Sequence, residues 1–223
     1  MITIKRLFYN LNMVKLITKD ENSKARILNA ATELFARKGF DGTSIREICK
    51  MAGVNICMIS YYWGGKQELY EGIIENLIEQ QTEYAKSFMD LNKKPADFTK
   101  SECIELLIKI LEKAADFLYS NKISNDLMVF LLKEQQNPER KLNSPVFSYV
   151  RELIAKIFDK DVNDKEIIYK TVFIFSQLNS PRILPAFCLR ELGQSEFKED
   201  DIRIIKDNIR FYIKAITGEG KVD

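Results

Sequence analysis

Residues 43–70 read TSIREICKMAGVNICMISYYWGGKQELY, and they contain the most specific local signals in the chain. Its first part contains Ser44 and Glu47 at the spacing of a helix capping box, and Gly53 follows the apolar positions of a short helix. Asn55 is a good N-cap for a second short helix, which ends at a pair of glycines. Two short helices joined by a connection that contains glycine predict a helix-turn-helix.

The rest of the chain also has helical patterns, and no Asn-Gly or Asp-Gly hairpin signal lies between alternating strands. We expect one helix before the quoted stretch, in residues 23–39, with Ser23 as its N-cap and Gly39 just after its end. Pro181 and Pro185 must break or kink the penultimate helix. The later helices are expected at residues 66–91, 100–119 and 124–136, and in segments that begin at 144, 164 and 198. The predicted fold class is all-α, with about nine helices and no strands.

The composition disfavours several classes of chemistry. The chain contains no histidine, which removes serine–histidine triads, cysteine–histidine pairs, histidine-ligated metal and imidazole acid–base catalysis. Cys49, Cys57, Cys103 and Cys188 form no CxxC pair and lie within helical patterns, so we interpret them as small buried hydrophobic residues in a reducing compartment. We therefore expect no enzymatic activity, no cofactor and no metal site.

The first 22 residues alternate polar and apolar without the continuous apolar core of a signal peptide. The run VFIF at 172–175 is far shorter than a membrane span. We expect a soluble cytoplasmic protein with no membrane partner. Met13 is a second candidate for the start of the protein, and the alternative is that the first residues form a basic arm that uses Lys5 and Arg6.

The net charge is only +2, but it is unevenly distributed. Residues 1–71 contain eleven Lys and Arg residues against seven Asp and Glu residues, a net charge of +4, which leaves −2 for residues 72–223. A basic amino-terminal third indicates contact with nucleic acid at one end of the chain.

The second short helix should present one face to a partner. Ile59 and Trp63, four residues apart, are expected to anchor it inward. Tyrosine hydroxyls and a lysine suit phosphate oxygens, and small apolar side chains suit thymine methyl groups. The residues expected to face outward are Ile56, Cys57, Ser60, Tyr61 and Lys66, with Tyr62 at the edge. The alternative is that the two tyrosines pack against the following long helix.

The run from Thr43 to Tyr70, within residues 24–70, resembles the amino-terminal DNA-binding domain of the TetR (tetracycline repressor) family. That family's pattern is a Thr-Ser/Thr-x-x-x-Ile helix, Ala-Gly-Val, a short recognition helix that ends Tyr-x-Tyr/His-Phe, then a small residue and Lys-x-x-Leu. The resemblance covers about a fifth of the chain. Two positions depart from the pattern, because Trp63 stands where phenylalanine is usual and Gly65 replaces a common serine.

The resemblance implies an all-α homodimer that represses transcription from a palindromic double-stranded DNA operator and is released by a small organic inducer. We expect an amino-terminal extension at 1–22, a helix-turn-helix DNA-binding domain at 23–70, and a larger helical ligand-binding and dimerisation domain at 71–223. The DNA contacts that the resemblance implies are Thr43, Ser44, Arg46, Asn55, Ile56, Cys57, Ser60, Tyr61, Tyr62 and Lys66. The candidates for lining an inducer pocket are Phe117, Met128, Phe130 and Gln177, and the alternative for each is plain core.

The last helix carries two apolar stripes. Two stripes need two partners, which we interpret as the helix's own domain and a second subunit. The first stripe contains Ile202, Ile205, Ile209, Tyr212 and Ile216, and the second contains Ile204, Phe211 and Ala215. The helix before it is apolar nearly all round between Val172 and Phe175. We expect the homodimer to form through these last two helices, and the alternative is a single-chain core with exposed edges.

The leading interpretation is a ligand-responsive transcriptional repressor. One alternative is a constitutive DNA-binding protein whose carboxy-terminal domain only dimerises. Another is a helical enzyme or small-molecule binding protein that has kept the amino-terminal domain as a relic. The missing histidine and the absence of glycine loops that cradle phosphates disfavour that last alternative.

Overall fold

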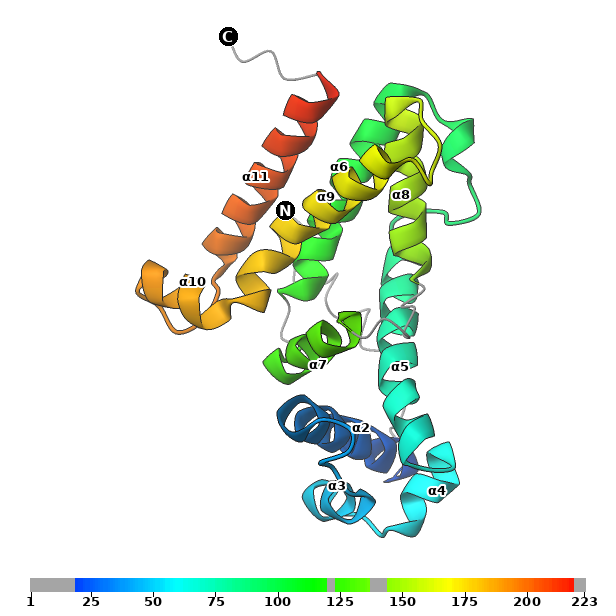
Figure 1. Cartoon of the computed structure of the whole chain (residues 1–223), viewed down its shortest axis with the longest axis vertical. Coiled ribbons are helices and arrows are strands. Elements are labelled where there is room, and N and C mark those ends of the chain that lie inside the picture. Colours follow the sequence, from blue (N-terminus) through cyan, green and yellow to red (C-terminus); the bar gives the residue numbers. More distant parts are fainter. Residues whose placement is uncertain (1–18, 120–122, 137–143, 219–223) are drawn as a thin grey trace, which may run out of the picture. The chain divides into compact units, whose positions relative to one another are not determined.

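The computed structural model describes residues 19–119, 123–136 and 144–218 (Figure 1). Within those ranges the chain is all-α and contains no strand. Most of the amino-terminal extension lies outside them, including Met13, Lys5 and Arg6. The helices, in chain order, are α2 (Lys19–Lys38), α3 (Ile45–Ala52), α4 (Cys57–Trp63), α5 (Lys66–Lys86), the 3₁₀ helix η1 (Pro95–Asp97), α6 (Lys100–Leu118), α7 (Asn125–Gln135), α8 (Pro145–Phe158), α9 (Lys165–Ile183), α10 (Pro185–Leu192) and α11 (Glu199–Thr217).

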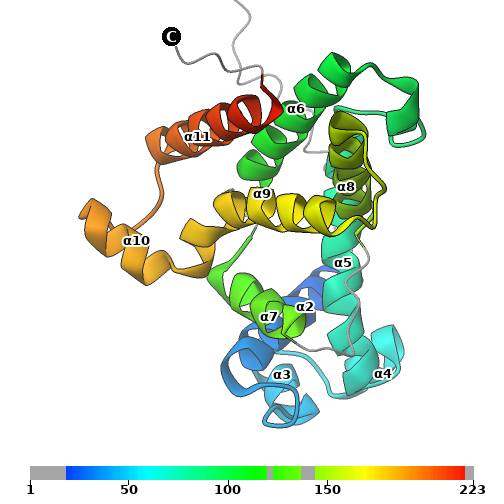
Figure 2. The same cartoon turned by 45° about the horizontal axis from the view of Figure 1, so that its top comes forward.

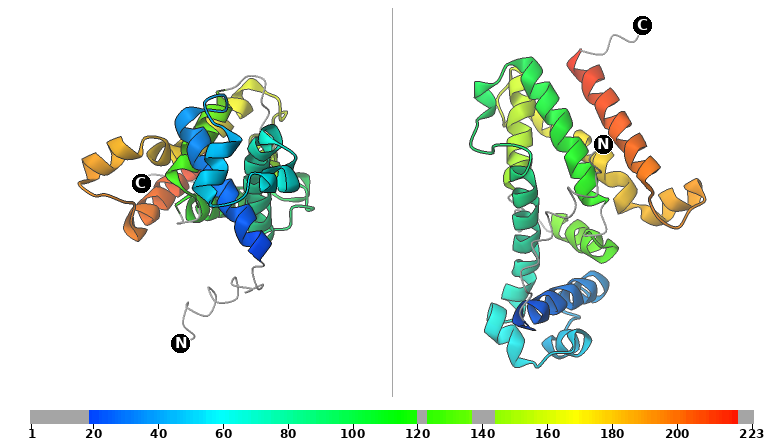
Figure 3. Two further views of the ribbon diagram at one scale, coloured as in Figure 1. Left: turned by 90° about the horizontal axis from the view of Figure 1, so that it is seen from below. Right: turned by 180° about the vertical axis from the view of Figure 1, so that it is seen from behind.

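The chain divides into two compact units, and the boundary between them falls between Ile73 and Ile74, inside α5. The first unit contains α2, α3, α4 and the beginning of α5, and α2 packs directly against α3 (Figure 3). Its core is made of side chains that are at most 1% exposed, contributed by all four helices: Ile27, Ala31, Phe35, Ile48, Ile59 and Leu69.

The start of α2 differs from the prediction. The helix begins at Lys19, so Ser23 lies inside it and is not the N-cap. The residues that precede Ser23 read Lys-Asp-Glu-Asn. No glycine or proline stands there to stop the helix, so it continues upstream of the serine.

Both predicted boundaries of α3 are confirmed. Ser44 caps α3 and forms the complete capping box with Glu47. Gly53 ends α3 in the left-handed region, at φ 64°, where a side chain would be strained.

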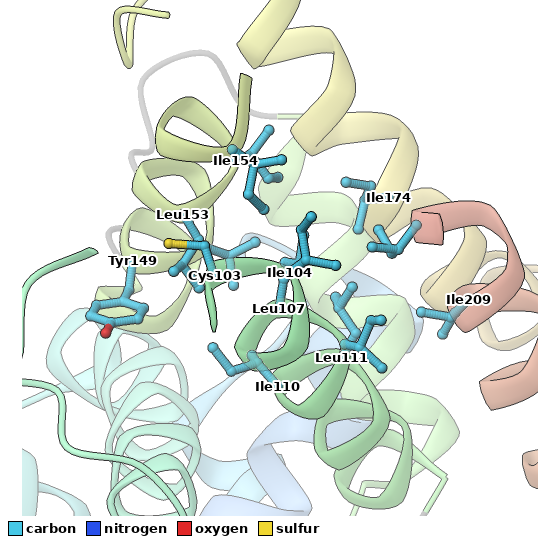
Figure 4. Packing of buried hydrophobic residues seen from close by; sticks show 14 of the residues in the cluster. Cys103, Ile104, Leu107, Ile110, Leu111, Tyr149, Leu153, Ile154, Ile174 and Ile209 are labelled. Atoms are coloured by element: carbon cyan, nitrogen blue, oxygen red, sulfur yellow. The ribbon is translucent and has the colours of Figure 1, made fainter. Parts of the chain in front are cut away.

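The second unit is organised around a core to which α6, α8, α9 and α11 all contribute (Figure 2). Helix α6 packs against α8 and α11, and α9 packs against α8, α7 and α11. Figure 4 shows how the side chains converge, with Leu111 and Ile174 near Ile209 of α11, and Leu153 and Ile154 of α8 opposite α6.

The two apolar stripes of α11 have different environments. The first stripe faces the core, where Ile209 is 2% exposed and its other members are partly buried, together with the fully buried Ile213. Two ion pairs attach the same helix to α6, Lys206 with Asp116 and Arg210 with Glu112. The second stripe remains exposed in the single chain, with Ile204 at 51% and Phe211 at 65%.

Near residue 183 the chain forms two separate helices and not one kinked helix. Pro181 lies inside the last turn of α9, which ends only at Ile183. Pro185 then occupies the first position of a separate helix, α10, where its fixed φ and missing N–H are tolerated. The described residues therefore form ten α-helices, one more than the sequence predicted.

The cysteines differ in burial. All four are free thiols; Cys49 and Cys103 are buried, Cys188 is half-buried and Cys57 is exposed. The interpretation of every cysteine as a buried hydrophobic residue is therefore wrong for Cys57, because it begins α4 on the face that points to solvent. No helix among the described residues is long and apolar enough to cross a membrane.

Candidate nucleic-acid interface and ligand cavity

Thr43 holds the turn between α2 and α3. Its side chain is 2% exposed, and its hydroxyl donates to the carbonyl oxygen of Gly39 at 2.8 Å and lies 3.2 Å from that of Leu34. A buried hydroxyl with its proton committed to backbone carbonyls does not face a phosphate. The structure therefore gives the Thr43 side chain a different role from the expected DNA contact, which is to fix the geometry of the turn.

Ser44 and Glu47 form a charged cap at the start of α3. The Ser44 hydroxyl accepts from the Glu47 amide at 3.2 Å, and both the amide and the hydroxyl of Ser44 donate to the Glu47 carboxylate. Lys38 of α2 pairs with the same carboxylate at 2.6 Å. The hydrogen bond from Lys38 and those from Ser44 lower the pKa of Glu47 from 4.5 to about 2. This network fixes α3 on α2.

Replacing Glu47 with Gln is expected to destabilise the first unit at neutral pH, and the difference from wild type should shrink in acid. The pKa of Glu47 is lower in the folded state, so its contribution is present above about 4.5 and is lost as the pH falls toward about 2. Urea unfolding of both proteins between pH 7 and pH 3, followed by the fluorescence of the single tryptophan, measures the difference. If the difference in free energy of unfolding between the two proteins stays constant over this pH range, the stabilising role of the Glu47 carboxylate is contradicted.

Helix α4 begins one residue later than predicted, with Ile56 and not Asn55 as its N-cap. The side-chain oxygen of Asn55 accepts from the Cys57 amide at 2.9 Å, so this asparagine caps the turn that precedes the helix. The side chains of Asn55, Ile56, Cys57 and Ser60 are all exposed. Tyr61 is 73% exposed, and the Tyr62 ring meets it edge to face at a centroid distance of 5.1 Å. The first two turns of α4 therefore present a face that is uncharged, partly aromatic and open to solvent.

The opposite face of α4 is anchored as the sequence predicted. Ile59 is fully buried, and Trp63 is half-buried. Trp63 lies directly over Gly72 of α5, where a Cβ atom would be only 2.8 Å from the indole nitrogen Nε1. The Nζ atom of Lys24 lies 5.7 Å from the centroid of the Trp63 ring. The indole is thus enclosed by α2, α5 and Tyr62, and it sets the position of the end of α4.

Lys66, at the start of α5, is positioned by an aromatic ring. Its Nζ atom lies 4.2 Å from the centroid of Phe40, which itself packs against Phe35 and edge-on against Tyr70. Arg46 is exposed on α3. The first unit therefore combines an uncharged helix face with positively charged side chains on the neighbouring elements, the arrangement that direct base reading with phosphate contacts requires.

The second unit contains a cavity of about 480 Å³. Its walls come from α5 beyond Ile74, from α6, α7 and α9, and from the first turn of α8 with the residue before it. Of its 23 lining residues, 18 are apolar. The volume lies within the range of about 300–1,000 Å³ that is usual for small-molecule sites. The polar lining residues are Gln81, Tyr84, Ser144, Ser176 and Asn179.

Of the four residues predicted from sequence to line an inducer pocket, two line the cavity and two do not. Phe117 and Met128 line the cavity. Phe130 is 1% exposed and is not one of its lining residues. Gln177 is also outside the lining, although its neighbours Ser176 and Leu178 belong to it. The amides that line the cavity are those of Gln81 and Asn179.

Sequence reasoning missed Gln81 and Asn179, although one signal pointed to the first. Along α5 the cavity-lining positions 74, 77, 78, 81, 84, 85 and 88 follow helical spacing, and Gln81 interrupts an otherwise apolar and aromatic stripe. A polar amide at such a position is unusual. For α9 the sequence gives no comparable signal, since apolar residues occupy nearly every side of the helix.

Both units are similar to proteins of one regulator family. Residues 27–73 match the model of the bacterial regulatory proteins of the tetR family, and residues 103–218 match the model of the C-terminal domain of the HTH-type transcriptional dual regulator CecR. The CecR protein of Shigella flexneri is 26% identical over 217 residues, which make up 92% of this chain and 96% of that protein. The HTH-type transcriptional regulator RutR of Escherichia coli K12 is 28% identical over 101 residues, 45% of each chain.

Solved structures share the fold. A TetR-family transcriptional regulator from Bordetella parapertussis 12822 superposes with a TM-score of 0.59, at 16% identity, over 86% of this chain and 94% of its own. A TetR-like transcriptional regulator from Rhodococcus sp. RHA1 gives a TM-score of 0.55, at 16% identity, over 88% of this chain and 96% of its own. The carboxy-terminal family model alone covers more than half of the chain, and the amino-terminal one covers the helix-turn-helix described above. The chain therefore belongs to the TetR family of bacterial transcriptional regulators.

Proposed function

We propose that the protein is a sequence-specific repressor that binds a palindromic operator as a homodimer in the bacterial cytoplasm and is released from it by a small organic ligand. The observation that carries this proposal is the exposed face of α4. Ile56 at 46% and Tyr61 at 73% exposure are large apolar and aromatic side chains open to solvent on a short, firmly anchored helix. Such a face suits insertion into the major groove.

The proposed DNA contacts divide into two kinds. Ile56 and Cys57 lie at the start of α4 and read base edges, chiefly through contact with thymine methyl groups. Tyr61, Arg46 and Lys66 contact phosphates and fix the orientation of the helix. Asn55, Ser60 and Tyr62 complete the surface of the recognition helix. Ser44 is exposed at the start of α3, but its amide and hydroxyl both donate to the Glu47 carboxylate, so we assign it to the cap and not to the phosphate contacts.

Lys66→Ala and Tyr61→Phe are each expected to weaken operator binding about three- to tenfold and to leave the fold intact. Lys66→Ala should also reduce the slope of log affinity against log salt by about one, because the variant has one positive charge fewer to displace a counterion from the DNA. Fluorescence-anisotropy titration at several salt concentrations measures both effects. Gln67→Ala, at an exposed neighbouring position, is the control, and unchanged affinity and slope for Lys66→Ala would contradict its role.

The proposed dimer forms through the exposed sides of α9 and α11. On α9, Ile168, Tyr169 and Phe173 are between 41% and 54% exposed, although the opposite side of the same helix is buried in the core. The second stripe of α11 is exposed in the same way. Large apolar side chains gathered on two long helices indicate a covered surface in the assembled protein. A dimer also supplies the two recognition helices that a palindromic operator needs.

The proposed release depends on α5. This helix begins in the first unit and provides one wall of the cavity in the second. A ligand acts as an inducer when it binds more tightly to an arrangement in which the two recognition helices no longer fit successive half-sites. Because α5 is continuous from Lys66 to Lys86, a change in its position at the cavity is transmitted to the DNA-binding unit without a flexible linker.

Titration of the protein against its own upstream DNA and against a scrambled duplex tests the function directly. We expect saturable binding that is at least about a thousandfold tighter for the upstream duplex at physiological salt. Equal and steeply salt-dependent binding to both duplexes would contradict a sequence-specific regulator at that site.

A second function is favoured by one comparison. The Shigella flexneri relative is named a dual regulator, and it aligns over 92% of this chain. We therefore infer that regulation in both directions is the principal alternative to simple repression. Deleting the gene and measuring transcript levels distinguishes the two alternatives. Loss of a simple repressor only raises transcription from the promoters that it binds, whereas loss of a dual regulator raises transcription from some and lowers it from others. A constitutive DNA-binding protein would give the same increases but no response of the DNA complex to any cavity ligand.

A further inference from the structure

The described lining of the second unit's cavity carries no charged side chain. Among the described residues that line it, none is Asp, Glu, Lys or Arg. The charged residues of α6 that lie nearest in sequence, Glu112, Lys113 and Asp116, form ion pairs with one another or with α11. The described part of the lining therefore offers hydrogen bonds and apolar surface, but no formal charge.

Two side-chain amides are available to a ligand. No hydrogen bond from another described residue engages the amide of Gln81 on α5 or that of Asn179 on α9. Both are only half-buried, and both line the cavity. Each amide carries a donor and an acceptor, so a pair of them can satisfy hydroxyl, carbonyl or amide groups of either polarity.

Of the remaining polar lining groups, the two serines already form hydrogen bonds within the chain, and Tyr84 carries an uncharged hydroxyl. The Ser176 hydroxyl donates to the carbonyl oxygen of Val172 at 2.8 Å, and the Ser144 hydroxyl accepts from the Phe147 amide at 3.3 Å. The Tyr84 ring stacks on Phe117 at a centroid distance of 5.4 Å. Burial, and then the charge of Asp116, raise the pKa of Tyr84, so its hydroxyl stays protonated.

We propose that this cavity selects a neutral, mainly apolar organic ligand whose few polar groups pair with Gln81 and Asn179, and that it discriminates against carboxylates, sulfonates, phosphates and cations. The inference rests on the proposed function, in which the cavity is the inducer site. An ionic ligand would lose its hydration and find no opposite charge in the lining, whereas a neutral ligand would lose little. The aromatic side chains Phe88, Phe117, Phe147 and Phe175 supply the apolar contacts.

A pair of fluorescent probes tests this selectivity. N-phenyl-1-naphthylamine and 8-anilino-1-naphthalenesulfonate share one aromatic skeleton and differ by a single sulfonate. Titration of the full-length wild-type protein with each is expected to give saturable binding that is at least tenfold tighter for the neutral probe. Ala114→Phe, which fills part of the cavity wall, should abolish binding of the neutral probe and thereby locate it in the cavity.

Two lysine variants test whether a charge at the cavity changes this preference. Gln81→Lys places an ammonium group at the cavity and should shift the preference toward the sulfonate by at least tenfold. Gln80→Lys adds the same charge at the adjacent exposed position, which does not line the cavity, and should leave the preference unchanged. Circular dichroism establishes that each variant is folded.

Three outcomes overturn the proposal: equal or tighter wild-type binding of the sulfonate, no binding of either probe, or an identical shift in the two lysine variants. The same preparations are titrated with operator DNA. A protein that binds the operator but prefers the sulfonate refutes the neutral-ligand inference alone. A protein that does not bind the operator refutes the proposed function, whichever probe it prefers.

Discussion

Phe211→Glu is expected to convert the protein from a dimer to a monomer and to weaken operator binding by at least about a hundredfold. Phe211 is 65% exposed on α11, and Ile204, two turns earlier, is 51% exposed on the same side. In the proposed dimer, a carboxylate at the centre of this stripe would be desolvated against its symmetry mate, which is strongly unfavourable. The monomer would then contact one half-site only and would lose the avidity of two linked recognition helices, about 10²–10⁴ in affinity.

Analytical ultracentrifugation gives the oligomeric state, and anisotropy gives the affinity for the full palindrome and for a single half-site. Ser101→Glu, which adds the same charge at an exposed position in the first turn of α6, is the control and should change neither. Affinity for the half-site should be the same in Phe211→Glu and wild type. A variant that stays dimeric, or a monomer that binds the palindrome as tightly as wild type, would contradict the assigned interface.

The features that sequence predicted well are those set by neighbouring residues. The capping box of Ser44 and Glu47 and the left-handed Gly53 depend on fewer than ten consecutive positions, and the structure confirms both. The inward position of Ile59 follows from helical spacing in the same way. The alternation of a buried and an exposed stripe on α11 could also be read from the sequence, because its apolar residues fall into two groups about 120° apart around the helix.

The features that sequence did not predict depend on tertiary context or on helical phase. Ser23 has the chemistry of an N-cap, but nothing upstream of it stops the helix, so α2 starts at Lys19. In α9 apolar residues surround the helix, so the sequence does not show which side faces the cavity. The difference between Gln177, which lies outside the lining, and Asn179, which lies in it, is a rotation of about 200° that only packing against α5 to α8 determines.

The role assigned to Thr43 illustrates the limit of carrying a residue's function from a sequence motif. Its position at the start of α3 fits a phosphate contact by pattern, yet the hydroxyl is buried and donates to the carbonyl oxygen of Gly39. A threonine can serve the protein's own backbone or a ligand equally well. Only the packing of the turn between α2 and α3 separates the two roles.

Gly72→Ala is expected to weaken operator binding more than tenfold and to destabilise the first unit, although alanine normally stabilises a helix interior by about 1 kcal/mol relative to glycine. The added methyl would lie 2.8 Å from Nε1 and 3.0 Å from Cδ1 of Trp63. Overpacking of this kind typically costs about 1–3 kcal/mol. The indole must move, and because it fixes the end of α4, the recognition helix moves with it.

A second substitution tests whether Gly72→Ala acts through Trp63. In a Trp63→Phe background the smaller ring has room to shift away from the new methyl, so adding Gly72→Ala should restore operator affinity and raise thermal stability, as helix propensity alone requires. Circular dichroism and anisotropy on the wild type, the two single variants and the double variant complete the cycle. If Gly72→Ala has the same effect on affinity in both backgrounds, Trp63 is not the group it displaces, and the recognition helix is positioned by Ile59 and the core beneath it instead.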